Sequence, residues 1–230
     1  RNYNVQSKIK RENMKTKITI SASFLIIMFL FTLGCGNMDS SKQKLVITAH
    51  RGASGLAPEN TLASMKKAME IGADYSELDV HLTSDGAVIL LHDDTLDRTT
   101  NDSGSVYLKE LSSIKKLDAG KWFGNEFEGE PVPTLVEVID AVKGKMKLNI
   151  EIKISGNEPD IAEKVVAIVR EKKFQKQCMI TSFDKTTVLK VKEIAPELAV
   201  GYIIGGEFDG DPFIGPWEII STNYKNVNVE

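Results

Sequence analysis

Short apolar runs alternate with amphipathic stretches along most of the chain. Seven runs have the length and β-branched content of strands and are bounded by Gly, Asp, Ser or Pro. They cover residues 44–50, 75–80, 87–92, 147–153, 178–183, 198–204 and 218–224. Segments with helical periodicity separate several of them. This alternation predicts an α/β fold in which helices cover a mainly parallel sheet.

Three of the intervening segments carry helix start signals as well as helical periodicity. The pair Asn60 and Thr61 precedes the first, Asp160 the second and Asp184 the third, and each can cap a helix. The apolar positions that define their buried faces are Leu62, Met65 and Met69; Ile161, Val165, Ile168 and Val169; and Val188, Val191 and Ile194.

Polar residues alternate with apolar ones inside two of the strands. Glu77 and Asp79 share one strand face, and Glu151 and Lys153 share one face of another. A TIM-type (β/α)8 barrel accommodates this pattern, because its strands face helices on the outside and one another on the inside. Ligands of parallel α/β folds bind at the carboxyl ends of the strands. We therefore expect these side chains to converge at one rim.

Two histidines close apolar runs at the same ends. His50 ends the run 44–50 and His92 ends the run 87–92. They form a natural acid/base pair near neutral pH, although a single strand-end histidine is more often a structural hydrogen-bonding group. His81 shares the Glu77 and Asp79 face, but we expect it beyond the strand end, at the surface or rim.

Three carboxylates on rigid strands predict a site for one hard cation. Mg²⁺ and Ca²⁺ prefer oxygen ligands, whereas zinc prefers nitrogen and sulfur. Without a cation, Glu77, Asp79 and Glu151 would repel one another and their pKa values would rise. The alternative is a plain ion pair between Lys153 and one of the glutamates.

Basic residues beside the acids point to a phosphodiester substrate. Arg51 follows His50 directly and offers a forked donor for phosphate. A cation together with Arg51 and Lys153 would neutralise the phosphodiester, while one histidine activates the attacking oxygen and the other protonates the leaving alkoxide.

Charge and composition exclude some other functions. The chain has 230 residues, 42% hydrophobic and 27% charged, with a net charge of −3. Residues 1–17 carry six basic side chains and one acid, which leaves −8 for the remainder. An acidic body argues against nucleic-acid binding through phosphates. No G-x-G-x-x-G turn follows the first strand, which disfavours a dinucleotide site.

The N-terminal region reads as an export signal. After Met14 come two lysines, the apolar run "FLIIMFLFTLG" and then Cys35. This order resembles a bacterial lipoprotein signal peptide over 14–35, with Cys35 as the lipidation site, although Thr32 stands where Leu is usual. An uncleaved anchor or plain secretion are the alternatives. We expect residues 1–13 to be upstream read-through, 36–44 to be a polar tether, and the protein to be an exported, membrane-anchored lipoprotein. Cys178 is expected to be a buried hydrophobe without a disulfide partner.

The blocks HRG, PENT, ELDV, HDD and EIK, in this order, resemble the glycerophosphodiester phosphodiesterase family. The resemblance covers residues 47–183, with a weaker continuation to 224. It implies a TIM-type barrel that uses one divalent cation, Mg²⁺ or Ca²⁺, to hydrolyse glycerophosphodiesters to sn-glycerol 3-phosphate and an alcohol.

The resemblance also implies a role for each matching residue. The implied acid/base pair is His50 and His92, the metal ligands are Glu77, Asp79 and Glu151, the phosphate ligands are Arg51 and Lys153, and the residues shaping the mouth are Glu59 and Asn60. An insertion over about 94–145 resembles a small helical cap, in which Trp122 and Phe123 would cover the glycerol end. Packing within the insertion is the alternative for these two aromatic residues.

One departure from the family concerns the end of the barrel. The family's last strand has no counterpart after the run 218–224. We therefore expect residues 45–230 to form a barrel truncated before its eighth strand, with two unpaired edges and impaired folding and activity. Two further functions stay open, a sphingomyelinase D-like phospholipase and a non-catalytic lipoprotein that binds glycerophosphodiesters.

Overall fold

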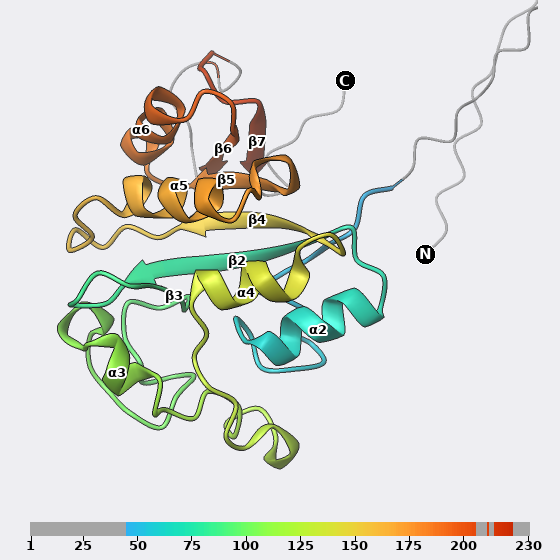
Figure 1. Cartoon of the computed structure of the whole chain (residues 1–230), viewed down its shortest axis with the longest axis vertical. Coiled ribbons are helices and arrows are strands. Elements are labelled where there is room, and N and C mark those ends of the chain that lie inside the picture. Colours follow the sequence, from blue (N-terminus) through green and yellow to red (C-terminus); the bar gives the residue numbers. More distant parts are fainter. Residues whose placement is uncertain (1–44, 206–210, 212–213, 223–230) are drawn as a thin grey trace, which may run out of the picture. The chain divides into compact units, whose positions relative to one another are not determined.

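The computed structural model describes residues 45–205, 211 and 214–222 (Figure 1). The expected signal peptide, Cys35 and the polar tether lie outside these residues. Within the described part of the chain, no helix has both the length and the apolar character needed to cross a bilayer.

Among the described residues, six parallel strands form the main sheet, and they neighbour one another in chain order. They are β1 (Thr48–Ala49), β2 (Tyr75–Leu82), β4 (Lys147–Ile152), β5 (Cys178–Ser182), β6 (Ala199–Ile204) and β7 (Ile219–Thr222). All five pairings along this path are parallel. A doubly wound sheet would reverse its strand order at a switch point, and the described strands contain no such reversal. The fold is therefore of the TIM-barrel type, as predicted.

The run 87–92 is not a barrel strand, contrary to the prediction. Its ordered part, β3 (Val88–Leu90), pairs antiparallel with β2, with Val80 opposite Leu90 and Leu82 opposite Val88. The connection from β2 is too short for a parallel crossover, so only a hairpin can form. The sequence therefore contributes six described barrel strands, where the apolar pattern alone indicated seven.

In the described part of the chain, four helices of at least eight residues accompany the strands. They are α2 (Leu62–Glu70), α4 (Leu135–Val142), α5 (Ile161–Glu171) and α6 (Lys185–Ile194). Thr61 caps α2 by accepting from the Ser64 amide, and Asp184 caps α6 by accepting from the Thr187 amide, as predicted. Asp160 occupies the cap position of α5 but adopts a left-handed conformation (φ 57°), and its side chain caps nothing.

The main core lies between the outward strand faces and these helices. Leu78, Val80, Leu148 and Ile150 are fully buried in it. Cys178 is buried there, as expected, and burial raises the pKa of its thiol to about 12. Because successive strand residues point to opposite faces, burying these apolar side chains turns Glu77, Asp79 and Glu151 towards the inside.

A second, smaller core lies in the segment between β3 and α4. Its secondary structure consists of η2 (Val106–Leu108), α3 (Leu111–Ile114) and η3 (Asn125–Phe127). The buried residues of this core are Ile89, Leu91, Leu96, Val106, Ile114, Ala119 and Val132. Helix α4 packs on the main core instead, so the segment that leaves the barrel layer is shorter than the predicted 94–145.

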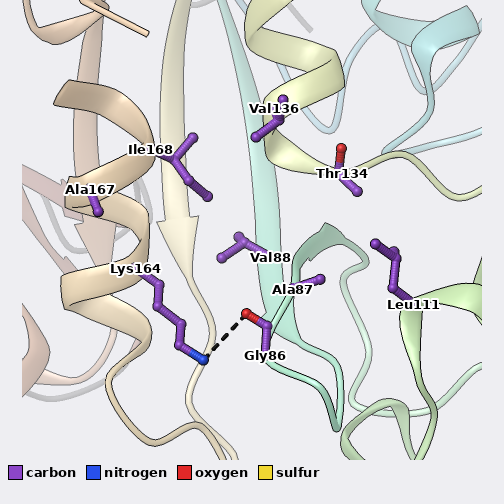
Figure 2. A pocket seen from close by; sticks show the side chains of 9 residues that line it. All are labelled: Gly86, Ala87, Val88, Leu111, Thr134, Val136, Lys164, Ala167 and Ile168. Atoms are coloured by element: carbon purple, nitrogen blue, oxygen red, sulfur yellow. Dashed lines mark hydrogen bonds between the residues drawn. The ribbon is translucent and has the colours of Figure 1, made fainter. Parts of the chain in front are cut away.

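An apolar hollow of about 500 Å³ lies between β3, α4 and α5 (Figure 2). Val88, Val136 and Ile168 line it, and the Lys164 ammonium donates to the Gly86 carbonyl at 3.3 Å at one side. None of the predicted site residues lines this hollow.

We predict that Ile150→Ala destabilises the protein by about 2–5 kcal/mol, because it leaves a cavity between β4 and the helix layer. The free energy of unfolding from urea titrations provides the measurement. Leu189→Ala on the exposed side of α6 is the control and is expected to cost less than about 1 kcal/mol. Equal losses from the two variants would contradict this description of the core.

Candidate active site

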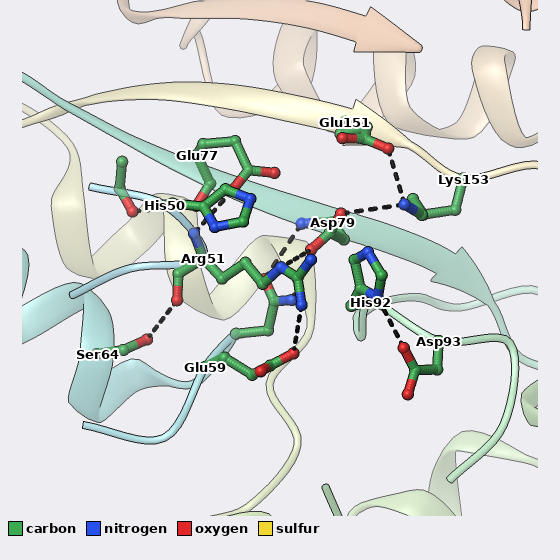
Figure 3. Close-up of polar contacts among 12 residues, drawn as sticks. His50, Arg51, Glu59, Ser64, Glu77, Asp79, His92, Asp93, Glu151 and Lys153 are labelled. Atoms are coloured by element: carbon green, nitrogen blue, oxygen red, sulfur yellow. Dashed lines mark hydrogen bonds and ion pairs between the residues drawn. The ribbon is translucent and has the colours of Figure 1, made fainter. Parts of the chain in front are cut away.

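Three carboxylates meet on the inner face of neighbouring strands (Figure 3). Glu77 and Asp79 belong to β2, and Asp79 lies opposite Glu151 of β4 in the strand pairing. All three side chains are buried, and one oxygen from each lies within 4.8 Å of the other two. The alternation of strand residues thus brings together acids that are 72 positions apart along the chain.

The cluster has the electrostatics of a cation site. Burial, and then the Asp79 charge, raise the pKa of Glu77 to about 8, and burial also raises the pKa of Glu151. The buried Oε1 atom of Glu77 has no hydrogen-bond partner among the described residues. Clustered carboxylates with an oxygen left over fit one hard divalent cation such as Mg²⁺ or Ca²⁺.

Basic groups neutralise part of the cluster. The Lys153 ammonium lies 2.9 Å from Glu151 and 3.6 Å from Asp79. The ion pair considered as an alternative to a metal site is therefore present, but it engages Glu151 and leaves Glu77 without a lysine partner among the described residues. Arg51 Nε lies 3.6 Å from Asp79, on the side opposite Lys153 (Figure 3).

A strained loop after β1 places Arg51 at the cluster. Arg51, Gly52 and Asn60 all adopt positive φ, at 55°, 77° and 55°. A Cβ at Gly52 would lie 2.2 Å from Ser64 Oγ, so this position requires glycine. The Arg51 amide donates to the Glu77 carboxylate at 2.7 Å, and the Asn60 side-chain amide donates to Asp79 at 2.8 Å.

His50 lies on the exposed side of the acids. Its side chain is 70% exposed, and Nε2 lies 3.8 Å from Glu77. Partial desolvation and then the adjacent Arg51 charge lower the pKa of His50. The imidazole is therefore neutral at pH 7 and able to accept a proton.

His92 reaches the site by a different route from the one predicted. It follows the antiparallel strand β3, which returns alongside β2, rather than ending a parallel strand. Its Nδ1 lies 2.7 Å from the Asp93 carboxylate. The histidine and the acids nevertheless share one site, with His92 beside Lys153 and Asp79 (Figure 3).

His81 was expected beyond the strand end, at the surface or rim, and the structure contradicts both the strand end and the surface position. Strand β2 continues to Leu82, so His81 stays on the inner face and is 2% exposed. Its Nε2 lies 3.3 Å from the His92 carbonyl, and its Nδ1 lies 3.9 Å from Glu158. Burial is the main cause that lowers the pKa of His81. The alternation of Glu77, Asp79 and His81 carried the signal for this placement.

Two site residues were missed in the sequence, Asp93 and Arg98. The Arg98 guanidinium makes two contacts with Asp93, at 2.7 and 3.1 Å, and two with Glu59, at 2.9 and 2.8 Å. Glu59 also accepts from Arg51 Nη1 at 3.0 Å. The only sequence signal was an arginine five positions after the first aspartate of HDD.

The aromatic pair of the insertion packs on its own segment. Trp122 and Phe123 meet edge to face, with ring centroids 5.7 Å apart, and Phe123 stacks in the same way on Phe127. The Trp122 indole donates to the Ala119 carbonyl at 2.8 Å. These contacts match the packing alternative, and substrate contact by Trp122 and Phe123 stays a prediction.

Open space beside the cluster can receive a substrate. A hollow of about 460 Å³ is lined by His92, Asp94 and Lys153 among others, and one of about 450 Å³ is lined by Glu151, Lys153 and Phe183 among others. Lys153 borders both hollows. An anionic group bound beside Lys153 would therefore face both the acids and His92.

An α/β barrel with a buried acid cluster and adjacent basic groups fits a hydrolase of phosphoric diesters, and comparison with known proteins shows this class. A model of the glycerophosphoryl diester phosphodiesterase family matches residues 50–209. The chain belongs to this family.

Several relatives have high similarity. A glycerophosphodiester phosphodiesterase of Caldanaerobacter subterraneus is 47% identical over 163 residues, which are 70% of this chain and 67% of the relative. A putative one of Bacillus subtilis, YhdW, is 40% identical over 71% of this chain and 68% of the relative.

Solved structures agree with the sequence relatives. A phosphodiesterase of Oleispira antarctica, in complex with the product sn-glycerol-3-phosphate, has a TM-score of 0.68 and 38% identity. A glycerophosphodiester phosphodiesterase of Agrobacterium tumefaciens has a TM-score of 0.65 and 38% identity. In both cases the match covers 70% of this chain and 67% of the other.

We predict that cation binding releases a proton at pH 7. Because the pKa of Glu77 is raised to about 8 in the cation-free protein, Glu77 is protonated at pH 7 and must ionise to bind a cation. The apparent affinity for Mg²⁺ or Ca²⁺ is therefore expected to rise up to about tenfold per pH unit between pH 6 and 8, and to level off above that.

Calorimetric titration in buffers of different ionisation enthalpy measures this proton release directly. Glu77→Gln removes the group whose pKa is raised to about 8, so any binding that remains is expected to depend less on pH than in the unaltered protein. An affinity of the unaltered protein that does not change between pH 6 and 9 would contradict the prediction.

Proposed function

We propose that this protein is a metal-dependent glycerophosphodiester phosphodiesterase that releases sn-glycerol 3-phosphate and an alcohol. The observation that carries the proposal is the buried cluster of Glu77, Asp79 and Glu151. The buried Oε1 atom of Glu77 has no hydrogen-bond partner among the described residues, and Arg51 and Lys153 lie on two sides of the cluster. The product bound to the Oleispira antarctica relative supports the choice of substrate class.

Glu77, Asp79 and Glu151 are the proposed ligands of one Mg²⁺ or Ca²⁺. When bound, the cation would stabilise negative charge on the phosphoryl oxygens of the substrate. Arg51 and Lys153 bind the same phosphoryl group from opposite sides, which removes the repulsion between the diester and an incoming oxygen. The strained loop holds Arg51 in place before substrate arrives, so little reorganisation is needed.

His50 and His92 are the proposed acid/base pair. His50 is the proposed base, because its lowered pKa leaves it neutral at pH 7 and so able to accept a proton. It takes a proton from water as the water oxygen bonds to phosphorus. The bond from phosphorus to the alcohol oxygen breaks, and protonated His92 gives its proton to that oxygen. Asp93 supports this role, since a carboxylate at Nδ1 stabilises the imidazolium and leaves Nε2 for the transfer.

The test is release of sn-glycerol 3-phosphate from glycerophosphocholine. We expect a chelator to abolish the reaction and added Mg²⁺ or Ca²⁺ to restore it. His92→Asn is expected to lower kcat by about 10²–10⁴-fold, because the leaving alkoxide loses its proton donor. Glu151→Gln is expected to abolish cation-dependent activity, whereas Glu163→Gln, which changes a half-exposed acid of α5, is expected to leave it unchanged.

Other outcomes of the same assay would contradict this assignment. Cleavage of intact sphingomyelin but not of glycerophosphocholine would favour the sphingomyelinase D-like alternative. Tight binding of glycerophosphocholine without turnover, with the cation present, would favour the non-catalytic alternative.

The proposed setting is the outer side of a bacterial membrane, with the enzyme anchored through lipid on Cys35. The support is the order of basic, apolar and small residues over 14–35. In a bacterial host, we expect labelled palmitate to be incorporated into the protein and to be lost in Cys35→Ser. Cys178→Ser, which removes the other cysteine, is the control and is expected to keep the label. Labelling that persists in Cys35→Ser would refute the anchor.

A further inference from the structure

We infer that Arg98 is a positioning residue that fixes the proton-donating geometry of His92 through Asp93. The inference deepens the proposed function and rests on it, since it concerns the leaving-group proton. Arg98 itself contacts neither histidine. It acts through hydrogen bonds to the carboxylates of Asp93 and Glu59.

Arg98 holds both oxygens of the Asp93 carboxylate, and Asp93 in turn contacts His92. Asp93 Oδ1 lies 2.7 Å from His92 Nδ1 and also accepts from Arg98 Nη2 at 3.1 Å. Its Oδ2 accepts from Arg98 Nε at 2.7 Å. Both carboxylate oxygens are therefore held by the planar guanidinium, and the carboxylate cannot rotate without breaking one of these bonds. The orientation of the His92 ring follows from that of the carboxylate.

Arg98 is itself held in place by Glu59. Its other edge is held by Glu59, with Nη1 2.9 Å from Oε2 and Nη2 2.8 Å from Oε1. The same Oε1 accepts from Arg51 Nη1 at 3.0 Å. One guanidinium thus joins the loop after β1, which carries Arg51, to the segment after β3, which carries His92.

The positive charge of Arg98 also stabilises the ionised forms of the two carboxylates that it bridges. Hydrogen bonds from Arg98 are the largest cause that lowers the pKa of Asp93 to about 2, and Arg98 and Arg51 together lower the pKa of Glu59 despite its burial. Without Arg98, two carboxylates would face each other without a shared cation. A lysine would restore the charge but not the four contacts, since a single ammonium cannot bind two carboxylates edge-on.

A defect in His92 orientation has a specific kinetic signature. An alkoxide such as that of choline needs a proton to leave, whereas p-nitrophenolate leaves without one. A misplaced general acid therefore slows cleavage of the choline ester and spares the nitrophenyl ester. A general loosening of the site, or loss of phosphate binding through Arg51, slows both esters alike.

The experiment compares Arg98→Met and Arg98→Lys with the unaltered chain on glycerophosphocholine and on the p-nitrophenyl ester of glycerol 3-phosphate. For Arg98→Met we expect kcat on the choline ester to fall by about 30–100-fold and kcat on the nitrophenyl ester by less than about fivefold. Arg98→Lys is expected to show the same selectivity at about a third of the size, because it keeps charge without geometry.

Arg170→Met is the matched control. Arg170 has the same exposure as Arg98, 45% against 44%, and likewise binds a glutamate, Glu197, at 2.8 Å, but it lies on α5. We expect both esters to be cleaved at unchanged rates by this variant.

Histidine ¹⁵N spectra give a readout that is independent of turnover, and the chain has only three histidines to assign. We expect the hydrogen-bonded Nδ1 proton of His92 to lose its protection from exchange in Arg98→Met and in Arg98→Lys. The second variant decides the question if the first does not fold.

Equal losses on the two esters, or an unchanged His92 signal, would overturn the inference and leave Arg98 a purely structural residue. Failure of the proposed function looks different. In that case the unaltered chain cleaves neither ester with the cation present, and the inference falls with it.

Discussion

Mutual repulsion among three buried carboxylates is the constraint around which this molecule is organised. Glu77, Asp79 and Glu151 lie on adjacent strands. They share the inner face because the opposite faces of those strands are buried in the apolar core. Burial, and then the Asp79 charge, raise the pKa of Glu77. Arg51 and Lys153 relieve the repulsion in part, and a divalent cation would relieve the rest. The positive charges that neutralise the acids are also the charges that would bind a phosphodiester. The same groups therefore serve the folded state and the chemistry.

Arginine serves two separate purposes around this cluster. Arg51 is held in a strained backbone conformation next to the acids, with its Nε lacking a hydrogen-bond partner among the described residues. Arg98 is fully engaged by two carboxylates. The first arginine thus faces the acid cluster, while the second uses its donors on the two carboxylates that support it. Glu59 accepts hydrogen bonds from both arginines.

Periodicity made much of the fold and of the acid cluster predictable. Strand alternation places Glu77, Asp79 and Glu151 on one face, and helix start signals located Thr61 and Asp184 correctly. Chain connectivity was the weaker signal. An apolar run such as 87–92 has the same pattern in a hairpin as in a barrel, and only the short connection before it distinguishes the two.

The residues missed depend on contacts that have no periodic signature. Arg98 meets Glu59 across 39 positions, which no local pattern encodes. His81 was misplaced because strand length was underestimated by two residues, and Asp160 because a cap residue can adopt a left-handed conformation instead of capping. The acid cluster was therefore easier to predict from the sequence than the hydrogen-bond network around Arg98 that supports the site.

Strand β2 carries Glu77, Asp79 and His81 on one face and pairs with three other strands. A slip of its register by one residue would turn these acids into the helix layer and bring Leu78 and Val80 into the polar interior. Such a slip would remove the apolar core and the cation site in a single event. The correct register of β2 is thus required both for the apolar core and for the acid cluster. A chain in which Leu78 and Val80 are buried in the core has its acids on the inner face.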